Sequence, residues 1–88
     1  MRRTKLEIIH DVLRAIQEKG GKIKPTHLLY KSNLSHKKMV EYLDELHGKG
    51  FIEEHKAKDG KKIVLTDKGF SFLGEFKKIK EFTDSFGL

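Results

Sequence analysis

The hydrophobic residues near the start of the chain recur with the period of an α-helix. Between Thr4 and Lys19 they lie three or four positions apart, at Leu6, Ile9, Val12, Leu13 and Ile16. This spacing places them on one face of a helix. Thr4 and Glu7 have the spacing of a capping box, in which each side chain bonds the backbone N–H of the other residue. The pattern predicts a first helix that ends at Gly20-Gly21.

A short extended segment and a second, shorter helix come next. Residues 22–24 form a linker that we expect to contain a first strand, with Ile23 pointing inward. Pro25 suits the first turn of a helix, where its missing N–H is not needed. This helix should span about two turns, to Lys31. Its expected core residues are Leu28 and Leu29.

A tight turn and a third helix follow. Residues 32–34 form the turn, and Asn33 tolerates the left-handed backbone that such turns often need. Ser35 is a good N-cap for a helix expected from His36 to about His47. One stripe of this helix is apolar, with Met39, Leu43 and Leu46 flanked by Val40 and Tyr42. The opposite side carries Lys37, Lys38, Glu41, Asp44 and Glu45.

The alternation of residues then changes to that of a β-hairpin. Strands are predicted over residues 51–58 and 61–66, because Asp59-Gly60 between them is a strong signal for a type I′ turn. A two-residue loop at that point would place Lys56 opposite Ile63 and Glu54 opposite Leu65. The residues expected on the core face are Ile52, Ile63 and Leu65.

A last helix, capped by Thr66, is expected from Asp67 to about Thr83. Phe70 and Leu73 are expected to pack on the rest of the domain. Aromatic residues are unusually dense on this helix, and left exposed they would form a patch typical of an interface. The predicted dimer-interface residues are Phe72, Phe76, Ile79, Phe82 and Phe86. The alternative is that the tail folds back onto the first helix.

The order helix, helix, turn, helix, hairpin and helix predicts a mainly α fold with a small β-hairpin wing, in the α+β class. This is the layout of a winged helix-turn-helix, whose second motif helix enters the DNA major groove. An 88-residue chain makes one compact unit at most. Within it we expect residues 1–66 to form the winged helix-turn-helix and residues 67–88 a C-terminal helix for dimerisation.

The composition is basic, with 19 Lys and Arg against 13 Asp and Glu and a net charge of +6. Small basic domains often bind a polyanion, although many bind none. On the third helix only the first turn and a half, from Ser35 to Lys38, suits a phosphate-lined groove, because the acidic residues beyond it would repel phosphates. The wing adds four lysines, which would also protect an exposed strand edge from aggregation.

Twelve residues of the helix-turn-helix and wing are the candidate DNA contacts. They are Lys24, Thr26, Lys31, Ser32, Ser35, His36, Lys37, Lys38, Lys56, Lys58, Lys61 and Lys62. The third helix has no Arg, Asn or Gln to make bidentate contacts with bases, so we expect modest sequence specificity.

Other functional classes find little support in the sequence. No apolar run is long enough to cross a membrane, and the N-terminus lacks the apolar core of a signal peptide. Cysteine is absent, which fits a cytoplasmic protein. The five histidines are scattered, and no phosphate loop or nucleophile motif is present. We expect no enzyme activity, no cofactor, no metal and no small-molecule ligand. The near absence of Asn and Gln beside abundant Lys and Glu is typical of thermophile proteins.

Two segments carry a family resemblance. LLYKSNLSHKKMVEYLDELHGKGFIEE, followed after the hairpin turn by KIVLTDKGFSFL, resembles the small archaeal winged helix-turn-helix proteins. These are basic homodimers of about this size, described as chromatin-associated or as predicted transcriptional regulators. The resemblance implies binding of double-stranded DNA through the helix headed by Ser35 and through the wing. It also implies a homodimer joined by an antiparallel coiled coil of the C-terminal helix.

The predicted function is therefore a DNA-binding transcriptional regulator or nucleoid-associated protein. Two alternatives remain open at this point. Many winged helices bind proteins, and the acidic half of the third helix would suit a basic partner. The lysine-rich wing would also bind RNA, since lysines do not choose between polyanions.

Overall fold

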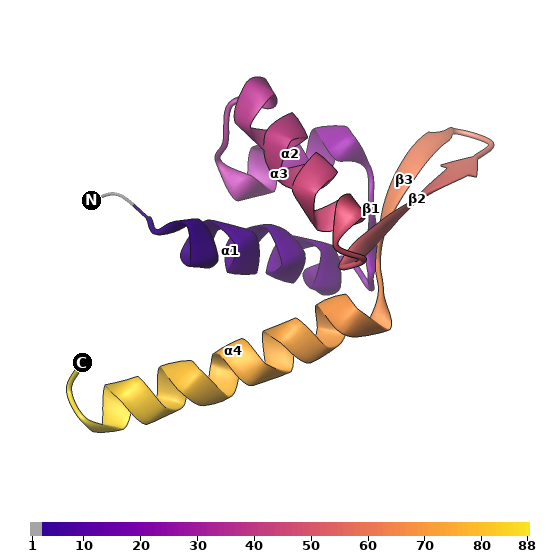
Figure 1. Cartoon of the computed structure of the whole chain (residues 1–88). Helices are drawn as coiled ribbons and strands as arrows, with labels where there is room; N and C mark the ends of the chain where they lie inside the picture. Colours follow the sequence, from indigo (N-terminus) through magenta and orange to yellow (C-terminus); the bar gives the residue numbers. More distant parts are fainter. Residues whose placement is uncertain (1–2) are drawn as a thin grey trace.

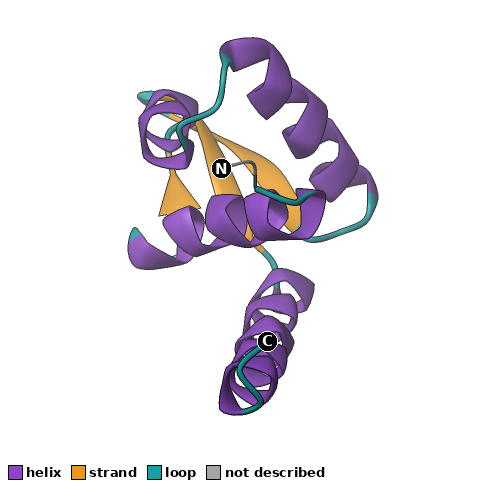
Figure 2. Cartoon of the chain, turned by 90° about the vertical axis from the view of Figure 1, so that its left-hand side faces the viewer, coloured by secondary structure: helices purple, strands orange, loops and turns teal. Residues whose placement is uncertain are grey.

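The structure, a computed structural model, describes residues 3–88. Four helices and three strands follow one another in the order that the sequence predicts. They are α1 (Lys5–Glu18), β1 (Lys22–Ile23), α2 (Pro25–Ser32), α3 (His36–Gly48), β2 (Ile52–Ala57), β3 (Gly60–Leu65) and α4 (Asp67–Ser85). The strands form one antiparallel sheet in the order β1-β3-β2. The helices α1, α2 and α3 pack around this sheet, and α4 extends away from them (Figures 1 and 2).

The caps predicted from the sequence are present in the structure. The Thr4 hydroxyl accepts a hydrogen bond from the Glu7 N–H, and the Glu7 carboxylate accepts one from the Thr4 N–H, both at 3.1 Å. The bond from the Thr4 backbone lowers the pKa of Glu7. Asn33 ends α2 in the left-handed conformation, with φ of 55°. The Ser35 hydroxyl then accepts from the Lys38 N–H at 3.2 Å, which confirms Ser35 as the cap of α3.

The hairpin forms, but its predicted register is wrong by two residues. Lys56 lies opposite Lys61 and Glu54 opposite Ile63, so the two-residue turn is Lys58-Asp59. A type I′ turn needs positive φ at both central residues. Here Gly60, with φ of 116°, takes up the positive conformation just after the turn instead. A shift of two residues preserves which side chains share a face, so the expected core residues of the hairpin are still buried.

One hydrophobic core joins all the layers. Its buried members include Val12, Leu13 and Ile16 from α1, Leu28, Met39, Leu43 and Leu46 from α2 and α3, and Ile23, Ile52, Ile63, Leu65 and Leu73 from the strands and α4. The expected apolar face of α1 is confirmed except at its start, where Leu6 is 53% exposed. Leu6 faces the gap between α1 and α4.

The first turn of α4 is fastened to the segment that follows α3. The Thr66 hydroxyl caps α4 by accepting from the Gly69 N–H, and it donates to the Gly50 carbonyl at 2.6 Å. The Lys68 ammonium donates to the Lys49 carbonyl at 2.6 Å. Gly69 approaches so closely that an added Cβ would lie 2.5 Å from the Phe51 carbonyl oxygen. These contacts fix the direction in which α4 leaves the domain.

Candidate nucleic-acid interface

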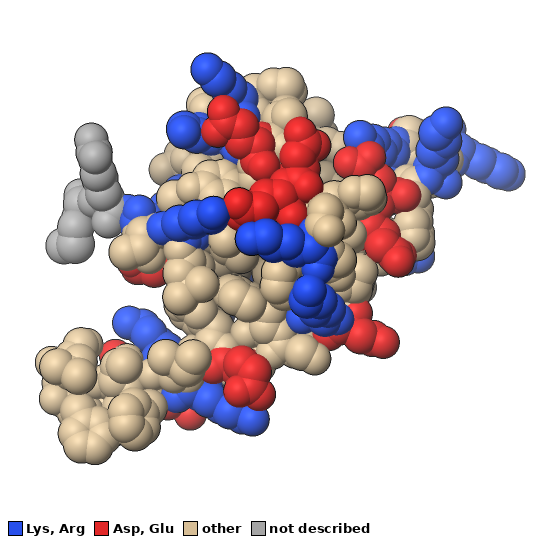
Figure 3. All heavy atoms as spheres, in the orientation of Figure 1, with Lys and Arg blue, Asp and Glu red and all other residues tan. Residues whose placement is uncertain are grey.

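The first turn of α3 and the tip of the β2–β3 hairpin lie toward the same edge of the molecule. In Figure 1 both point to the top, while α4 runs along the bottom. Figure 3 shows lysines over the start of α3 and over the hairpin, with acidic side chains gathered between them. The predicted DNA-contact residues therefore form two basic patches separated by an acidic surface.

The basic patch on α3 consists of Lys37 and Lys38 beside the Ser35 cap, all exposed. Lys38 makes an ion pair with Glu41 at 3.5 Å, one turn along the helix. Lys37 has no acidic partner within residues 3–88. The free N–H groups of a helix start and the positive end of its dipole favour an anion at this position. The first turn of α3 thus combines a free lysine with an electropositive helix end.

The acidic end of α3 is partly neutralised by α1. Glu45 pairs with Lys5 at 2.7 Å, and this hydrogen bond lowers the pKa of Glu45 and raises that of Lys5. Glu41 is occupied by Lys38. Asp44 has no ion pair with any residue of the described chain. The acidic surface therefore carries less free charge than its composition suggests.

The hairpin tip is held by the carboxylate of Asp59, which the sequence predicted only as a turn residue. Asp59 lies 3.1 Å from the Lys24 ammonium and 3.7 Å from that of Lys62. The hydrogen bond from Lys24 is the largest cause of the lowered pKa of Asp59. Because Lys24 precedes α2, this contact joins the hairpin tip to the helix-turn-helix. No sequence signal links these residues, which are far apart in the chain.

The lysines of the hairpin differ in how much charge they have available. Lys61 pairs with Glu54 at 2.8 Å, and Lys62 shares Asp59 with Lys24. Lys56 and Lys58 have no acidic partner in the part of the chain that the structure describes. With Lys37, they are the lysines of the predicted set that are both exposed and unpaired within residues 3–88.

The remaining predicted contacts lie on α2 and at the first residue of α3. Thr26 and His36 are exposed, and Lys31 pairs with Glu18 at 3.5 Å. Ser32 corrects the prediction: its side chain is buried, and its hydroxyl donates to the Leu29 carbonyl. Ser32 ends α2 on the core side, so its hydroxyl is not on the surface with the lysines.

Two exposed residues on these helices are not among the predicted contacts. Tyr30 on α2 is 83% exposed, and Val40 on α3 is 41% exposed. Tyr30 lies one helical turn after Thr26, and Val40 lies one turn after Lys37. The structure also shows Arg3 bonding the Asp11 carboxylate at 2.7 Å and the Ser32 carbonyl at 3.1 Å. This contact ties the chain before α1 to the end of α2.

The aromatic residues of α4 divide into two groups. Phe72 packs edge-on against Phe51, and Phe76 stacks on His10 with ring centroids 4.2 Å apart. Leu73 is buried as expected, whereas Phe70 is 42% exposed. Farther along, Ile79, Phe82 and Phe86 are 61%, 63% and 68% exposed. The structure therefore covers the first part of the predicted interface stripe within the chain and leaves its second part open.

Within residues 3–88 no group of three or more His, Asp or Glu side chains is placed to hold a metal ion. No helix in that range has both the length and the apolar character to span a membrane.

A helix-turn-helix with a hairpin beside its second helix defines a winged-helix domain. The chain belongs to the winged helix-turn-helix family, which matches residues 2–84. The uncharacterised protein MJ0287 of Methanocaldococcus jannaschii is 31% identical over 84 residues, covering 96% of this chain and 80% of that protein. The family relationship thus extends to an archaeal protein of similar length.

Two solved structures are similar over almost the whole chain. Sso10a-2, a DNA-binding protein from Sulfolobus solfataricus, is 29% identical with a TM-score of 0.76 over 94% of this chain and 87% of its own. F93 from STIV, a winged-helix DNA-binding protein, shares the fold with a TM-score of 0.72 at 19% identity, over 91% of this chain and 92% of its own. Both alignments cover more of the chain than residues 1–66 contain, so they extend beyond the winged helix.

Proposed function

We propose that this protein is a homodimeric transcriptional regulator or nucleoid-associated protein that binds double-stranded DNA. The first turn of α3 would enter the major groove, and the β2–β3 wing would contact the backbone beside it. Membership of the winged helix-turn-helix family supports this function, as does the similarity to Sso10a-2. The protein would act by binding rather than by catalysis, at the nucleoid.

The observation that carries the proposal is the position of the three unpaired lysines. Lys37 lies at the start of α3, and Lys56 and Lys58 lie on the wing. These two positions would let the protein contact phosphates on either side of a groove. The acidic surface between them would then stay clear of the backbone. Lysine contacts to phosphate give affinity but read no sequence.

Base recognition is expected to be weak. The exposed start of α3 offers His36, Lys37 and Lys38 but no Arg, Asn or Gln. Lys37 or Lys38 could contact a guanine, and no other bidentate base contact is available on this helix. The protein should therefore bind duplexes of many different sequences with similar affinity.

Salt dependence of binding to a random-sequence duplex tests the proposal. If three lysines per protomer neutralise one phosphate each, a dimer makes six contacts and log affinity should fall with log salt at a slope of about −5. Lys58→Ala should reduce the slope by about 2, because a dimer loses two contacts. A slope near zero for the unaltered protein would reject DNA as the partner.

Lys78→Ala is the matched control, since it removes the same charge from α4, where Lys78 pairs with Glu75. Equal effects of Lys58→Ala and Lys78→Ala would show that net charge alone attracts the DNA. Competition with duplex RNA addresses the alternative polyanion. The protein-interaction alternative receives less support, because Glu41 and Glu45 are already paired within the chain.

The homodimer is supported by the exposed end of α4. Ile79, Phe82 and Phe86 form an apolar surface on a helix that extends from the domain. Surfaces of this kind on a small protein mark an interface. Sedimentation should therefore give the mass of two chains.

A further inference from the structure

Two lysines of the candidate DNA contacts lie side by side on the sheet. β1 pairs with β3 so that Ile23 is opposite Ile63, and both of these residues are buried in the core. The same register continued by one residue brings Lys24 beside Lys62, and the backbone of Lys24 is still extended. Successive side chains of a strand point to opposite faces, so the two lysines point away from the core. Like charges placed opposite each other repel unless an anion lies between them.

The anion between the two lysines is the carboxylate of Asp59. One of its oxygens, Oδ2, lies 3.1 Å from the Lys24 ammonium and 3.7 Å from the Lys62 ammonium. His55, which is opposite Lys62 on β2, contacts the Glu53 carboxylate at 3.0 Å instead. Two ammonium groups that converge on one oxygen would hold a phosphate oxygen in the same way. The lysine pair is therefore an anion site that the chain fills with its own side chain.

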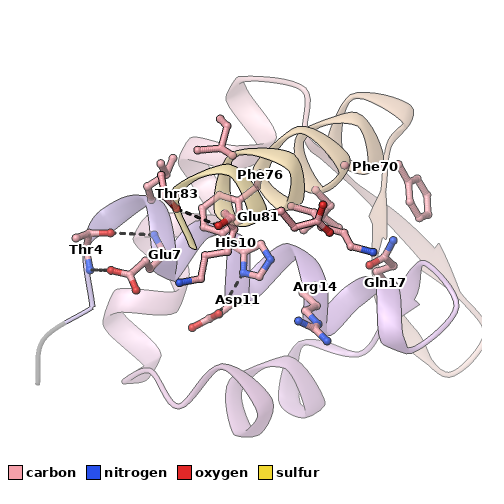
Figure 4. Close-up of a pocket in the computed structure, with 16 residues that line it drawn as sticks. Thr4, Glu7, His10, Asp11, Arg14, Gln17, Phe70, Phe76, Glu81 and Thr83 are labelled. Carbon is pink, nitrogen blue, oxygen red and sulfur yellow. Dashed lines mark hydrogen bonds and ion pairs between the residues drawn. The ribbon is translucent and has the colours of Figure 1, made fainter. Parts of the chain in front are cut away.

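Asp59 differs in this respect from the other paired carboxylates of residues 3–88. Asp11 also pairs with two basic side chains, Arg3 and His10, but it lies at the cleft between α1 and α4 (Figure 4), and neither partner is a candidate DNA contact. Within the same range, each of the other carboxylates that pair with candidate contacts holds only one of them. Asp59 thus neutralises more of the proposed DNA surface than any of these.

We propose that Asp59 closes a phosphate site on the wing: its carboxylate occupies the site formed by Lys24 and Lys62, so the DNA backbone does not bind there. This rests on the duplex binding proposed above and adds an autoinhibitory contact to it. The wing then contributes Lys56 and Lys58 to DNA binding, while two further lysines are withheld from it.

A phosphate gains little by displacing this carboxylate. Asp59 is tethered in the hairpin turn, three residues before Lys62, so it stays near the site even when an ion pair breaks. Its released charge would then repel the phosphate that had replaced it. The hydrogen bond from Lys24 lowers the pKa of Asp59, so the carboxylate keeps its charge at neutral pH. Exposed ion pairs are individually weak, so the exclusion comes from the tether and from this repulsion.

Asp59→Asn tests the closed site, because it removes the charge and keeps the size of the side chain. A dimer should then bind two more phosphates, one in each opened site, so the slope of log affinity against log salt should steepen from about −5 to about −7. Asp84→Asn on α4 is the matched control. Asp84 also pairs with a lysine, and its side chain is 58% exposed against 57% for Asp59. The control should leave the slope unchanged.

Lys24→Ala distinguishes an opened site from a change in net charge. On its own it should leave the slope near −5, about the value for six phosphate contacts, because DNA does not bind Lys24 in the unaltered protein. Combined with Asp59→Asn it should return the slope from about −7 to about −5, because the opened site needs both lysines. Circular dichroism checks that all variants are folded.

Two results of these measurements would overturn the proposal. If Lys24→Ala reduces the slope equally in both backgrounds, DNA binds Lys24 whether or not Asp59 is charged. If Asp59→Asn weakens binding, Asp59 serves to hold the wing in its binding position and does not close a site.

Inorganic phosphate tests the same site without DNA. At constant ionic strength it should shift the backbone amide NMR signals of Lys24 and Lys62 in Asp59→Asn and leave them unmoved in the unaltered protein. If these shifts occur but the unaltered protein binds no DNA, the proposed function is rejected and the closed site is retained. If the unaltered protein binds DNA but Asp59→Asn shows neither the shifts nor the steeper slope, the closed site is rejected and the function is retained.

Discussion

Replacing Gly69 with alanine tests how tightly α4 is fixed to the domain. Gly69 lies in the first turn of α4, and an added Cβ would come within 2.5 Å of both the Phe51 carbonyl oxygen and a Leu65 methyl group. The leucine can rotate, but the carbonyl is backbone that also accepts a hydrogen bond from the Thr66 N–H. Relief of the clash therefore requires α4 to move away from the segment that follows α3.

The change in unfolding free energy caused by Gly69→Ala is a balance of two opposing effects. Alanine in place of glycine stabilises a helix by about 1 kcal/mol. Overpacking a core costs about 1–3 kcal/mol, and a clash with backbone belongs at the upper end of that range. We expect Gly69→Ala to lower the unfolding free energy by about 2 kcal/mol, which corresponds to a fall in Tm of roughly 8–16 °C.

Gly74→Ala in the same helix provides the matched control, because nothing lies within 4 Å of a Cβ at Gly74. There only the helix preference acts, so Tm should rise by a few degrees for a gain of about 0.5–1 kcal/mol. Thermal unfolding followed by circular dichroism measures both variants. A Gly69→Ala protein as stable as Gly74→Ala would refute the close contact between α4 and Phe51.

The remaining predictions concern the cap of α3, the wing and acid stability. Ser35→Ala should lower the unfolding free energy by about 1 kcal/mol in urea titrations, since the Lys38 N–H loses its acceptor. Asp59→Asn should free Lys24 and Lys62 and steepen the salt dependence of DNA binding by about 0.9 per phosphate gained, whereas Glu75→Gln on α4 should not. The lowered pKa values of Glu7, Glu45 and Asp59 mean that the folded protein binds these protons less readily than the unfolded chain. The stabilisation from these carboxylates is complete above the ordinary carboxyl pKa and is lost as pH falls through the lower pKa values of the folded protein. Stability against urea should therefore drop as the pH falls from about 5 to about 3.

The elements of the fold could be predicted because their signals are local. Thr4, Ser35 and Thr66 are caps that act within one helical turn, and Asn33 sets the turn between α2 and α3 by its own φ angle. The hairpin register was not fixed in the same way. Asp59-Gly60 fits two turn geometries, since glycine supplies positive φ in either, and both registers bury the same face.

The candidate site was predictable in composition but not in its pairing. Lysine positions follow from the sequence, yet which of them are neutralised depends on contacts between distant segments. Lys24 meets Asp59, and Lys31 meets Glu18, only in the folded chain. For the same reason helical phase placed Phe72 and Phe76 on one stripe without showing that Phe51 and His10 would cover them.

The joint between α3 and α4 has a consequence for the length of the DNA site. Since Thr66 and Lys68 fix α4 to the loop that follows α3, the winged helix that carries α3 keeps a set angle to α4. In a dimer joined through the exposed end of α4, the number of α4 residues before the point of contact would determine both the separation and the relative rotation of the two winged helices. One residue inserted in α4 lengthens that helix by about 1.5 Å and rotates the attached winged helix by about 100°. The spacing of half-sites along the double helix would thus be set by helix length, independently of any base contact.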